Sequence, residues 1–141
     1  MTGYNKVFLD TTPLIYFLDN DSNFGMKTKA ILEEILSNNK ILITSVITCA
    51  EYLVYPYRTH NQEKIDVFFD FTSACGIELI PVSAETAKLA AKIRAEYKDF
   101  KGMDALQLAI AVQTGCDLFL TNDKQLRQFQ DIRCITVEEW A

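Results

Sequence analysis

The sequence has few of the residues that build zinc sites or disulfide frameworks. It contains one histidine, His60, and four cysteines, Cys49, Cys75, Cys116 and Cys134. No two cysteines have the C-x-x-C spacing of structural zinc sites, so we expect no such site. We interpret the cysteines as small, buried apolar residues with reduced thiols.

Long apolar runs, Gly/Ser linkers, low-complexity segments and repeats are also missing. Residues 1–10 (MTGYNKVFLD) have no apolar core of the kind found in signal peptides, and no run approaches membrane length. We therefore expect a cytoplasmic protein. The length of 141 residues and the apolar fraction of 49% predict one compact domain, residues 1–141.

Positive charge is scarce as well. The chain has 14 Lys and Arg against 19 Asp and Glu, for a formal net charge of −5. This balance argues against a protein that binds nucleic acid through a basic surface alone, because such binding depends on neutralising phosphates. It does not exclude an enzyme whose site holds cations.

Short apolar segments alternate with amphipathic ones along the chain. The alternation predicts a three-layer α/β/α sandwich with a central parallel sheet of four to five strands. Pro81 favours an edge position for the third strand. The expected strands are residues 6–10, 40–44, 77–82, 117–121 and 133–137, and the expected helices after the first strand are 27–39, 46–58, 61–76, 84–100, 102–115 and 123–129.

Polar residues and a proline mark the expected helix ends. Thr11 or Thr12 can cap a helix directly after the first strand, and Ser45 can cap the helix that follows the second. Asn122 has capping-box spacing before the last short helix. We expect Pro56 to end or kink its helix.

Four acids fall near the carboxyl ends of the expected strands. Asp10 ends the first strand, and Glu51 lies in the helix after the second. Asp104 opens the helix before the fourth strand, and Asp123 follows that strand. Right-handed crossovers place all strand ends at one edge of a parallel sheet, where ligands bind. We therefore expect the four carboxylates to lie close together.

Each acid also has a purely structural explanation. Asp10 can cap a helix, and Asp104 and Asp123 stand at helix N-termini, where the macrodipole favours anions. Glu51 is harder to explain in this way, because its neighbours in ITCAEYLVY are mostly apolar. We expect its carboxylate on or beside a packed face, where it needs a cation or a hydrogen-bonded partner.

A cluster of carboxylates indicates a bound cation, because clustered acids raise one another's pKa values. No histidine or thiolate is suitably placed, and an all-oxygen ligand set suits Mg²⁺ or Mn²⁺ rather than zinc. Such a site matches metal-assisted phosphoryl transfer. Thr11 and Thr12 add hydroxyls beside Asp10, although Thr11 has the alternative role of a helix cap.

Three segments resemble the motifs of the PIN-domain ribonucleases. Residues 8–19 (FLDTTPLIYFLD) resemble the first motif, an Asp followed by Thr or Ser and an apolar helix. Residues 43–54 (ITSVITCAEYLV) resemble the second. Residues 102–126 (GMDALQLAIAVQTGCDLFLTNDKQL) resemble the third and fourth together, and are the most specific segment. The resemblance covers essentially the whole chain.

The resemblance implies an endoribonuclease dependent on Mg²⁺ or Mn²⁺. It carries catalytic and metal-ligand roles onto Asp10, Glu51, Asp104 and Asp123, with Thr11, Thr12, Thr121 and Asn122 as auxiliary residues near the site. Small members of this size resemble the VapC-like toxins of toxin–antitoxin pairs, whose partner covers the acidic site with its C-terminal segment. The implied partners are an RNA substrate, an antitoxin and a second copy of the chain.

Basic residues gather in residues 88–101 (KLAAKIRAEYKDFK). The candidates to border the site are Lys88, Lys92 and Tyr97. Lys124, next to Asp123, is a candidate phosphate contact. An ordinary solvated helix face is the alternative explanation for these lysines.

Aromatic residues are the remaining candidates for binding surfaces. Tyrosines can stack on bases, although aromatic residues at helical spacing more often belong to a core or an interface. The candidates are Tyr16, Tyr52, Tyr55 and Tyr57. Residues 65–75 (IDVFFDFTSAC) are richer in aromatics than a solvated helix needs, which favours a homodimer or antitoxin surface.

Other functions fit the residues less well. A haloacid-dehalogenase-like phosphatase needs a second Asp two residues after the first, where this chain has Thr12. A receiver domain needs adjacent acids after the first strand, and these are missing. Two alternatives within the resemblance stay open: an RNA-processing nuclease without an antitoxin, and a catalytically silent binding module.

Overall fold

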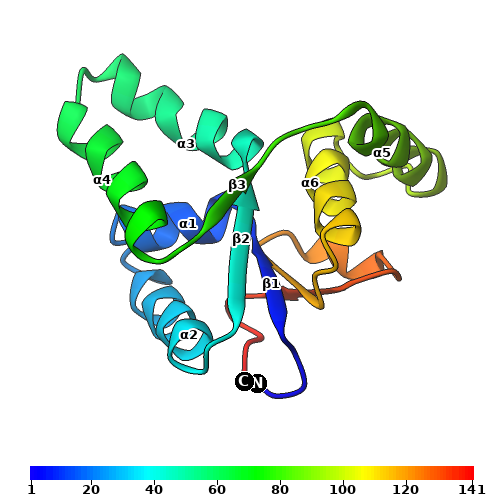
Figure 1. Ribbon diagram of the computed structural model, residues 1–141, viewed down its shortest axis with the longest axis horizontal. Helices are drawn as coiled ribbons and strands as arrows, with labels where there is room; N and C mark the ends of the chain where they lie inside the picture. Colours follow the sequence, from blue (N-terminus) through cyan, green and yellow to red (C-terminus); the bar gives the residue numbers. More distant parts are fainter.

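A computed structural model describes all 141 residues. One parallel sheet runs through the molecule in the order β3-β2-β1-β4-β5 (Figure 1). The predicted parallel sheet is confirmed, and β3 lies at an edge, as Pro81 indicated. The strands are β1 (Lys6–Leu9), β2 (Ile41–Ser45), β3 (Glu78–Ile80), β4 (Leu118–Thr121) and β5 (Arg133–Thr136).

Helices cover both faces of this sheet, which confirms the three-layer prediction. Figure 1 shows α1 to α4 on one side and α5 and α6 on the other. No helix combines the length and apolar character required to cross a membrane. The helices are α1 (Thr11–Leu18), α2 (Gly25–Ser37), α3 (Val46–Arg58), α4 (Gln62–Ala74), α5 (Ala84–Glu96) and α6 (Gly102–Gln113), and a short 3-10 helix η1 spans Lys124–Gln128.

The central strands alternate their side chains between two cores. On β1, Val7 and Leu9 pack in the core beneath α1 to α4, and Phe8 packs in the core beneath α5 and α6. Phe8 stacks on Phe119 of the neighbouring β4 with ring centroids 5.0 Å apart. Since both faces of the sheet are buried, the central strands are mostly apolar. The ends of β1 and β4 are therefore rigidly held.

Of three predicted helix caps near the carboxyl edge of the sheet, two need correction. Asp10, rather than Thr11 or Thr12, caps α1, because its Oδ1 accepts a hydrogen bond from the Thr11 backbone N–H at 2.8 Å. Asp123, rather than Asn122, caps the next short helix, which is 3-10 rather than α. The Asp123 carboxylate accepts from the backbone N–H two residues later at 2.9 Å. The Ser45 cap is confirmed.

Helix α3 spans Val46–Arg58, as predicted, but Pro56 lies inside it and does not end it, because the proline removes only one backbone donor close to the end of the helix. Helix α5 ends at Glu96 instead of residue 100. The chain turns there because Tyr97 and Phe100 stack on each other at 4.7 Å and pack against the ring of residue 129.

The four cysteines are free thiols in two environments. Cys116 and Cys134 are buried, as predicted. Cys49 and Cys75 are only partly buried, because they lie on α3 and just after α4, at the margin of the larger core. The prediction of buried cysteines is therefore confirmed for Cys116 and Cys134 and only partly met by Cys49 and Cys75.

Candidate active site

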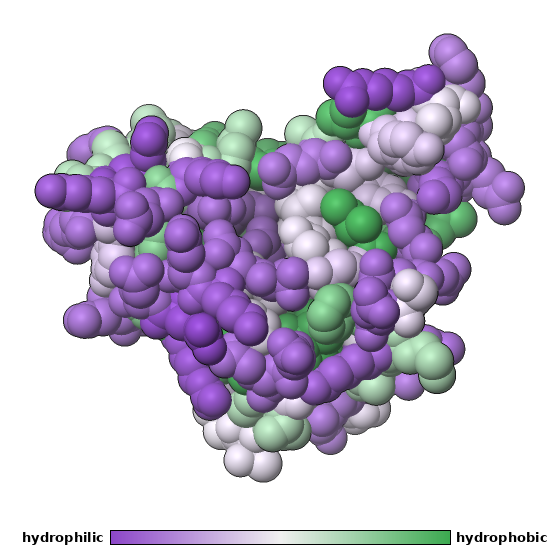
Figure 2. Space-filling view, turned by 180° about the vertical axis from the view of Figure 1, so that it is seen from behind, coloured by the Kyte–Doolittle hydropathy of each residue, from purple (hydrophilic) through white to green (hydrophobic).

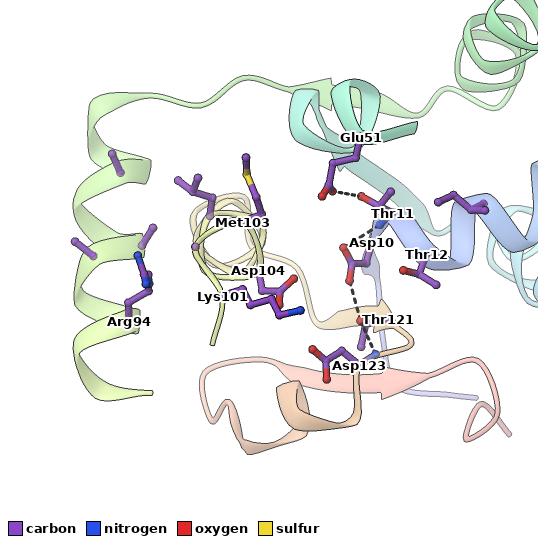
Figure 3. Close-up of a pocket in the computed structure, with 16 residues that line it drawn as sticks. Asp10, Thr11, Thr12, Glu51, Arg94, Lys101, Met103, Asp104, Thr121 and Asp123 are labelled. Carbon is purple, nitrogen blue, oxygen red and sulfur yellow. Dashed lines mark hydrogen bonds between the residues drawn. The ribbon is translucent and has the colours of Figure 1, made fainter. Parts of the chain in front are cut away.

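The four predicted acids line one cleft of about 930 Å³. It opens where the strand order changes direction, between β1 and β4, which is where open α/β sheets bind ligands. In Figure 3, Glu51, Asp10 and Asp123 form a column, and Asp104 projects toward it from the start of α6. Residues from four distant parts of the chain are thus brought to one site.

Asp10 is the buried member of the set, with 8% of its surface exposed. Its Oδ1 accepts from the Thr11 N–H at 2.8 Å, and its Oδ2 accepts from the Thr121 hydroxyl at 2.8 Å. Burial raises the pKa of Asp10 to about 6, although the hydrogen bonds from Thr121 and Thr11 lower it. The charges of Asp104 and Glu51 raise it further.

Asp104 and Asp123 are half-buried on either side of the cleft. Burial raises the pKa of Asp104, the charge of Asp123 raises it further, and nearby Lys101 opposes the change. The Asp123 backbone N–H donates to the Thr121 hydroxyl at 3.1 Å, so this threonine joins Asp123 to Asp10. The carboxylates therefore repel one another in the protein alone, a repulsion that a cation would relieve.

Glu51 lies beside a packed face rather than on it, and it has the hydrogen-bonded partner that the prediction required. Its side chain is exposed, while its neighbours Tyr52 and Leu53 are buried in the core. The reason is the helical period, which turns residue 51 toward the cleft and the next two residues inward. Glu51 Oε1 accepts a hydrogen bond from the Thr11 hydroxyl at 2.6 Å. Its carboxylate is thus partnered without a cation.

The predicted auxiliary residues divide into two groups. Thr11, Thr12 and Thr121 line the cleft. Thr11 and Thr121 are buried and hydrogen-bonded to acids, while Thr12 is exposed. Asn122 lies outside the lining.

The basic residues that line the cleft are not the ones selected from the sequence. Lys88, Lys92 and Lys124 lie outside the lining, and Arg94 and Lys101 belong to it (Figure 3). Lys88 instead lies 3.7 Å from a carboxylate on its own helix, and Lys124 lies 3.9 Å from a carboxylate near the C-terminus.

A signal for Arg94 was present in the sequence. Four residues of α5 line the cleft at i, i+3, i+4 and i+7, the spacing of one helix face: Ala87, Ala90, Ala91 and Arg94. The small alanines mark the side of α5 that faces the cleft, and Arg94 falls on it. Lys88 and Lys92 follow the lining positions by one residue, so they point elsewhere.

None of the candidate tyrosines lines the cleft. Tyr52 is buried and donates its hydroxyl proton to Asp19 Oδ1 at 2.9 Å. Tyr16 stacks on an aromatic ring beside it, and the Tyr97 hydroxyl accepts a backbone N–H outside the cleft. Tyr55 and Tyr57 are exposed on α3. Base stacking at the acidic site therefore has no structural support.

A buried polar network behind the carboxylates was missed in the sequence. It consists of Ser45, Thr48, Gln107 and Thr11, and it connects to Asp10 and Glu51. The available signal was Gln107, the one polar residue in the stretch ALQLAIAV of an otherwise buried helix. A buried amide needs hydrogen-bonding partners, and the nearest are these hydroxyls.

The donor set fits a hydrated magnesium or manganese ion. No three His, Cys, Asp or Glu side chains are close enough to hold an ion by direct contact alone. Mg²⁺ keeps several of its waters and uses only one or two carboxylates directly, so more widely spaced acids can bind it through those waters. The donors that line the cleft near Asp10 are carboxylate and hydroxyl oxygens, which these ions prefer.

Comparisons with known proteins agree with the fold. The family model of the PIN domain matches residues 7–132. Ribonuclease VapC1 of Aquifex aeolicus (strain VF5) is 28% identical over 140 residues, covering 96% of this chain and 93% of the relative.

Two solved structures have the same fold. A toxin–antitoxin complex from Klebsiella pneumoniae matches with a TM-score of 0.74 and 23% identity, covering 95% of this chain and 99% of the other. DNA-bound VapBC from Salmonella typhimurium matches with a TM-score of 0.74 and 21% identity, covering 94% and 98%.

Proposed function

This chain belongs to the PIN domain family, and we propose that it is a metal-dependent endoribonuclease that serves as the toxin of a toxin–antitoxin pair. The observation that carries the proposal is the convergence of Asp10, Glu51, Asp104 and Asp123 on one cleft. The similarity to a relative named as a ribonuclease supports the chemistry. The toxin–antitoxin complexes that share the fold support the biological role.

The four acids would hold Mg²⁺ or Mn²⁺ in this cleft. The bound ion would lower the pKa of a water and stabilise negative charge on the phosphate during phosphodiester hydrolysis. Asp10 provides a ligand whose position is fixed by two hydrogen bonds of 2.8 Å. Asp104 and Asp123, which are more exposed, face it across the cleft.

Arg94 and Lys101 are the residues we assign to the RNA backbone. Both line the cleft beside the acids, although the chain as a whole carries a net charge of −5. Lys101 lowers the pKa of Asp104, so its charge acts within the site. Two cations at the cleft can hold phosphates on either side of the bond that is cut. Arg94 and Lys101 therefore replace Lys88, Lys92 and Lys124 as our candidates for binding RNA phosphates beside the acidic cleft.

The hairpin formed by α3 and α4 is the candidate surface for a protein partner. Figure 2 views the molecule from behind, and apolar side chains gather between this hairpin and the body of the protein. Clustered exposed apolar side chains favour a binding surface. The exposed large apolar residues of the two helices are Val46, Val54, Tyr55, Tyr57, Val67 and Phe69. The antitoxin and a second copy of the chain are the two proposed occupants.

Two alternatives stand beside this proposal, and an RNA cleavage experiment distinguishes only the second from it. An RNA-processing nuclease without an antitoxin would use the same chemistry and differ in its genetic partner. A silent binding module would not need the acids. Burial, and to a smaller extent the neighbouring acids, raises the pKa values of Asp10 and Asp104, which favours a cation site over a silent module, because a bound cation would offset both costs.

The test is cleavage of total cellular RNA by the purified chain with Mn²⁺, Mg²⁺ or EDTA, beside Asp104→Asn. Mapping the new RNA ends identifies the target. We expect discrete cuts that require the metal and are absent with the variant. Identical RNA from wild type and variant under every condition would contradict catalysis and favour the binding module.

A further inference from the structure

We propose that Gln107 is a positioning residue of the acidic cleft, which fixes Asp10 relative to the helix that carries Glu51. The inference rests on the proposed function and assigns a role to a side chain outside the cleft lining. Gln107 lies on α6, one turn after Asp104, and is 1% exposed. A fully buried amide in an apolar helix is costly unless every polar atom has a partner.

Gln107 reaches two structural elements besides its own. Its Nε2 donates to the Thr48 hydroxyl at 2.7 Å and lies 3.5 Å from Asp10 Oδ1. Its Oε1 accepts from the Ser45 hydroxyl. Asp10 follows β1, while Ser45 and Thr48 begin α3. This single side chain therefore connects the end of the central strand to the start of the Glu51 helix.

The connection to Glu51 continues through two hydroxyls. The Thr48 and Thr11 oxygens are 3.1 Å apart, and Thr11 donates to Glu51 Oε1 at 2.6 Å. A threonine has only one proton to donate, so Thr11 serves Glu51 while Thr48 supplies the bond between the two hydroxyls. Each group in the series, from the Gln107 amide to the Glu51 carboxylate, then donates its proton to the next one. Such chains strengthen and orient each successive bond.

The first turn of α3 depends on the same amide. Ser45 caps this helix by accepting the Ile47 N–H at 3.1 Å, and its hydroxyl proton goes to Gln107 Oε1. The amide therefore holds both the cap and the Thr48 turn of the helix. Since no buried side-chain polar atom lacks a partner, removing the amide creates several unpaired groups at once. The carboxylates of Glu51 and Asp10 would then no longer be held in fixed positions relative to each other.

Only an amide of this length provides both functions. Leucine fills a similar volume but has neither donor nor acceptor. Glutamate keeps the acceptor for Ser45, but as a carboxylate it cannot donate to Thr48, and it adds a charge beside Asp10. Gln107→Leu therefore removes the whole connection, while Gln107→Glu removes its donor half.

The experiment measures Mn²⁺ affinity by calorimetry without RNA, followed by kcat and KM for RNA cleavage at saturating Mn²⁺. The variants are Gln107→Leu, Gln107→Glu and Thr48→Val. Leu108→Ala is the matched control, because residue 108 is buried on the same helix but packs in the core beneath α5 and α6. All proteins are assayed well below their melting temperatures.

We expect the Gln107 variants to lose about 10- to 100-fold in Mn²⁺ affinity or kcat, the loss typical of groups that orient metal ligands. KM for RNA should stay unchanged, because the amide does not contact the cleft. Thr48→Val should show the same pattern more weakly. Combined with Gln107→Leu it should add little, since both interrupt one network.

Three results would overturn the inference. Wild-type affinity and kcat in Gln107→Leu, or in Gln107→Glu if the first variant does not fold, would show that the amide orients nothing. Equal losses of Mn²⁺ affinity or kcat in Leu108→Ala would show that the Gln107 variants act only by destabilising the fold. If the wild-type chain bound no Mn²⁺ and cut no RNA, the proposed function itself would fail, and the role of Gln107 with it.

Discussion

The acidic cleft has a buried half and an open half. The buried half is Asp10 and Thr121, with Gln107 behind them, and each of these side chains is at most 8% exposed. The open half consists of residues that are half-buried or exposed: Glu51, Arg94, Lys101, Asp104 and Asp123. Both halves contain carboxylates, but only the buried half holds its carboxylate by hydrogen bonds to both oxygens.

Because of this difference, Asp10 is a fixed candidate ligand, while the acids of the open half can adjust their positions. Asp10 is mounted on a strand with neighbours on both sides, so its carboxylate can serve as the reference point of the site. No three acids are close enough to hold an ion directly. Binding therefore requires bridging waters or small movements, and the side chains free to move belong to the open half.

Lengthening one acid by a single methylene distinguishes the two halves. Asp10→Glu should cut RNA more than about 100-fold slower than wild type, a greater loss than groups outside the ligand shell cause. The buried slot between Thr11 and Thr121 cannot accept the longer chain without moving the carboxylate. Asp104→Glu should keep about tenfold more activity than Asp10→Glu, because the open half can adjust.

The comparison uses initial cleavage rates of one RNA at saturating Mn²⁺, with circular dichroism to confirm the fold. Equal losses in the two variants would mean that both halves are equally rigid, and the distinction would be wrong.

The stability of the metal-free protein should depend on pH mainly through the buried half. Burial raises the pKa of Asp10 from 3.8 to about 6. The folded state then binds this proton more tightly than the unfolded state, so the contribution of Asp10 to stability is greatest below about pH 4 and is lost as the pH rises through 6. The pKa difference corresponds to roughly 3 kcal/mol.

Asp10→Asn removes this titrating group, so its free energy of unfolding should fall correspondingly less as the pH rises. Urea unfolding of wild type and variant at about pH 4 and pH 7 measures the difference. If the free energy of unfolding of the wild type fell no more than that of Asp10→Asn, ionisation of Asp10 would not destabilise the folded protein.

The cations of the open half should affect substrate binding more than chemistry. Arg94→Ala and Lys101→Ala should each raise the Kd for RNA several-fold and reduce the dependence of binding on salt by about one counterion. Lys88→Ala is the control, because Lys88 is exposed on the same helix as Arg94 but lies outside the cleft lining.

Fluorescence anisotropy with an RNA oligonucleotide over a salt series gives these values, using Asp104→Asn to prevent cleavage. A larger effect from Lys88→Ala than from Arg94→Ala would restore the original assignment from the sequence.

The sequence predicted the framework of the site better than the contacts within it. Asp10, Asp104 and Asp123 could be placed because the period of the strands and helices determines which residues follow the strand ends. Whether Glu51 lies on the packed face or beside it could not be decided, since apolar neighbours on a helix do not show which way one residue points. The choice of Lys88 over Arg94 ignored the alanine face of α5.

Gln107 could not be assigned from the sequence, because its partners are distant along the chain. Ser45 and Thr48 meet it only after β2 and α3 pack beside α6, 62 and 59 residues away. A lone polar residue in a buried helix indicates that partners exist, but it does not say which ones.

The most direct test of the account is a crystal structure with Mn²⁺, whose anomalous scattering locates the ion without reference to the protein. We predict a peak in the cleft with Asp10 as a direct ligand, its hydrogen bond to Thr121 preserved, and displacement confined to Glu51, Asp104 and Asp123. A peak outside the cleft, none at saturating Mn²⁺, or one that leaves Asp10 without contact would contradict the assignment of this site.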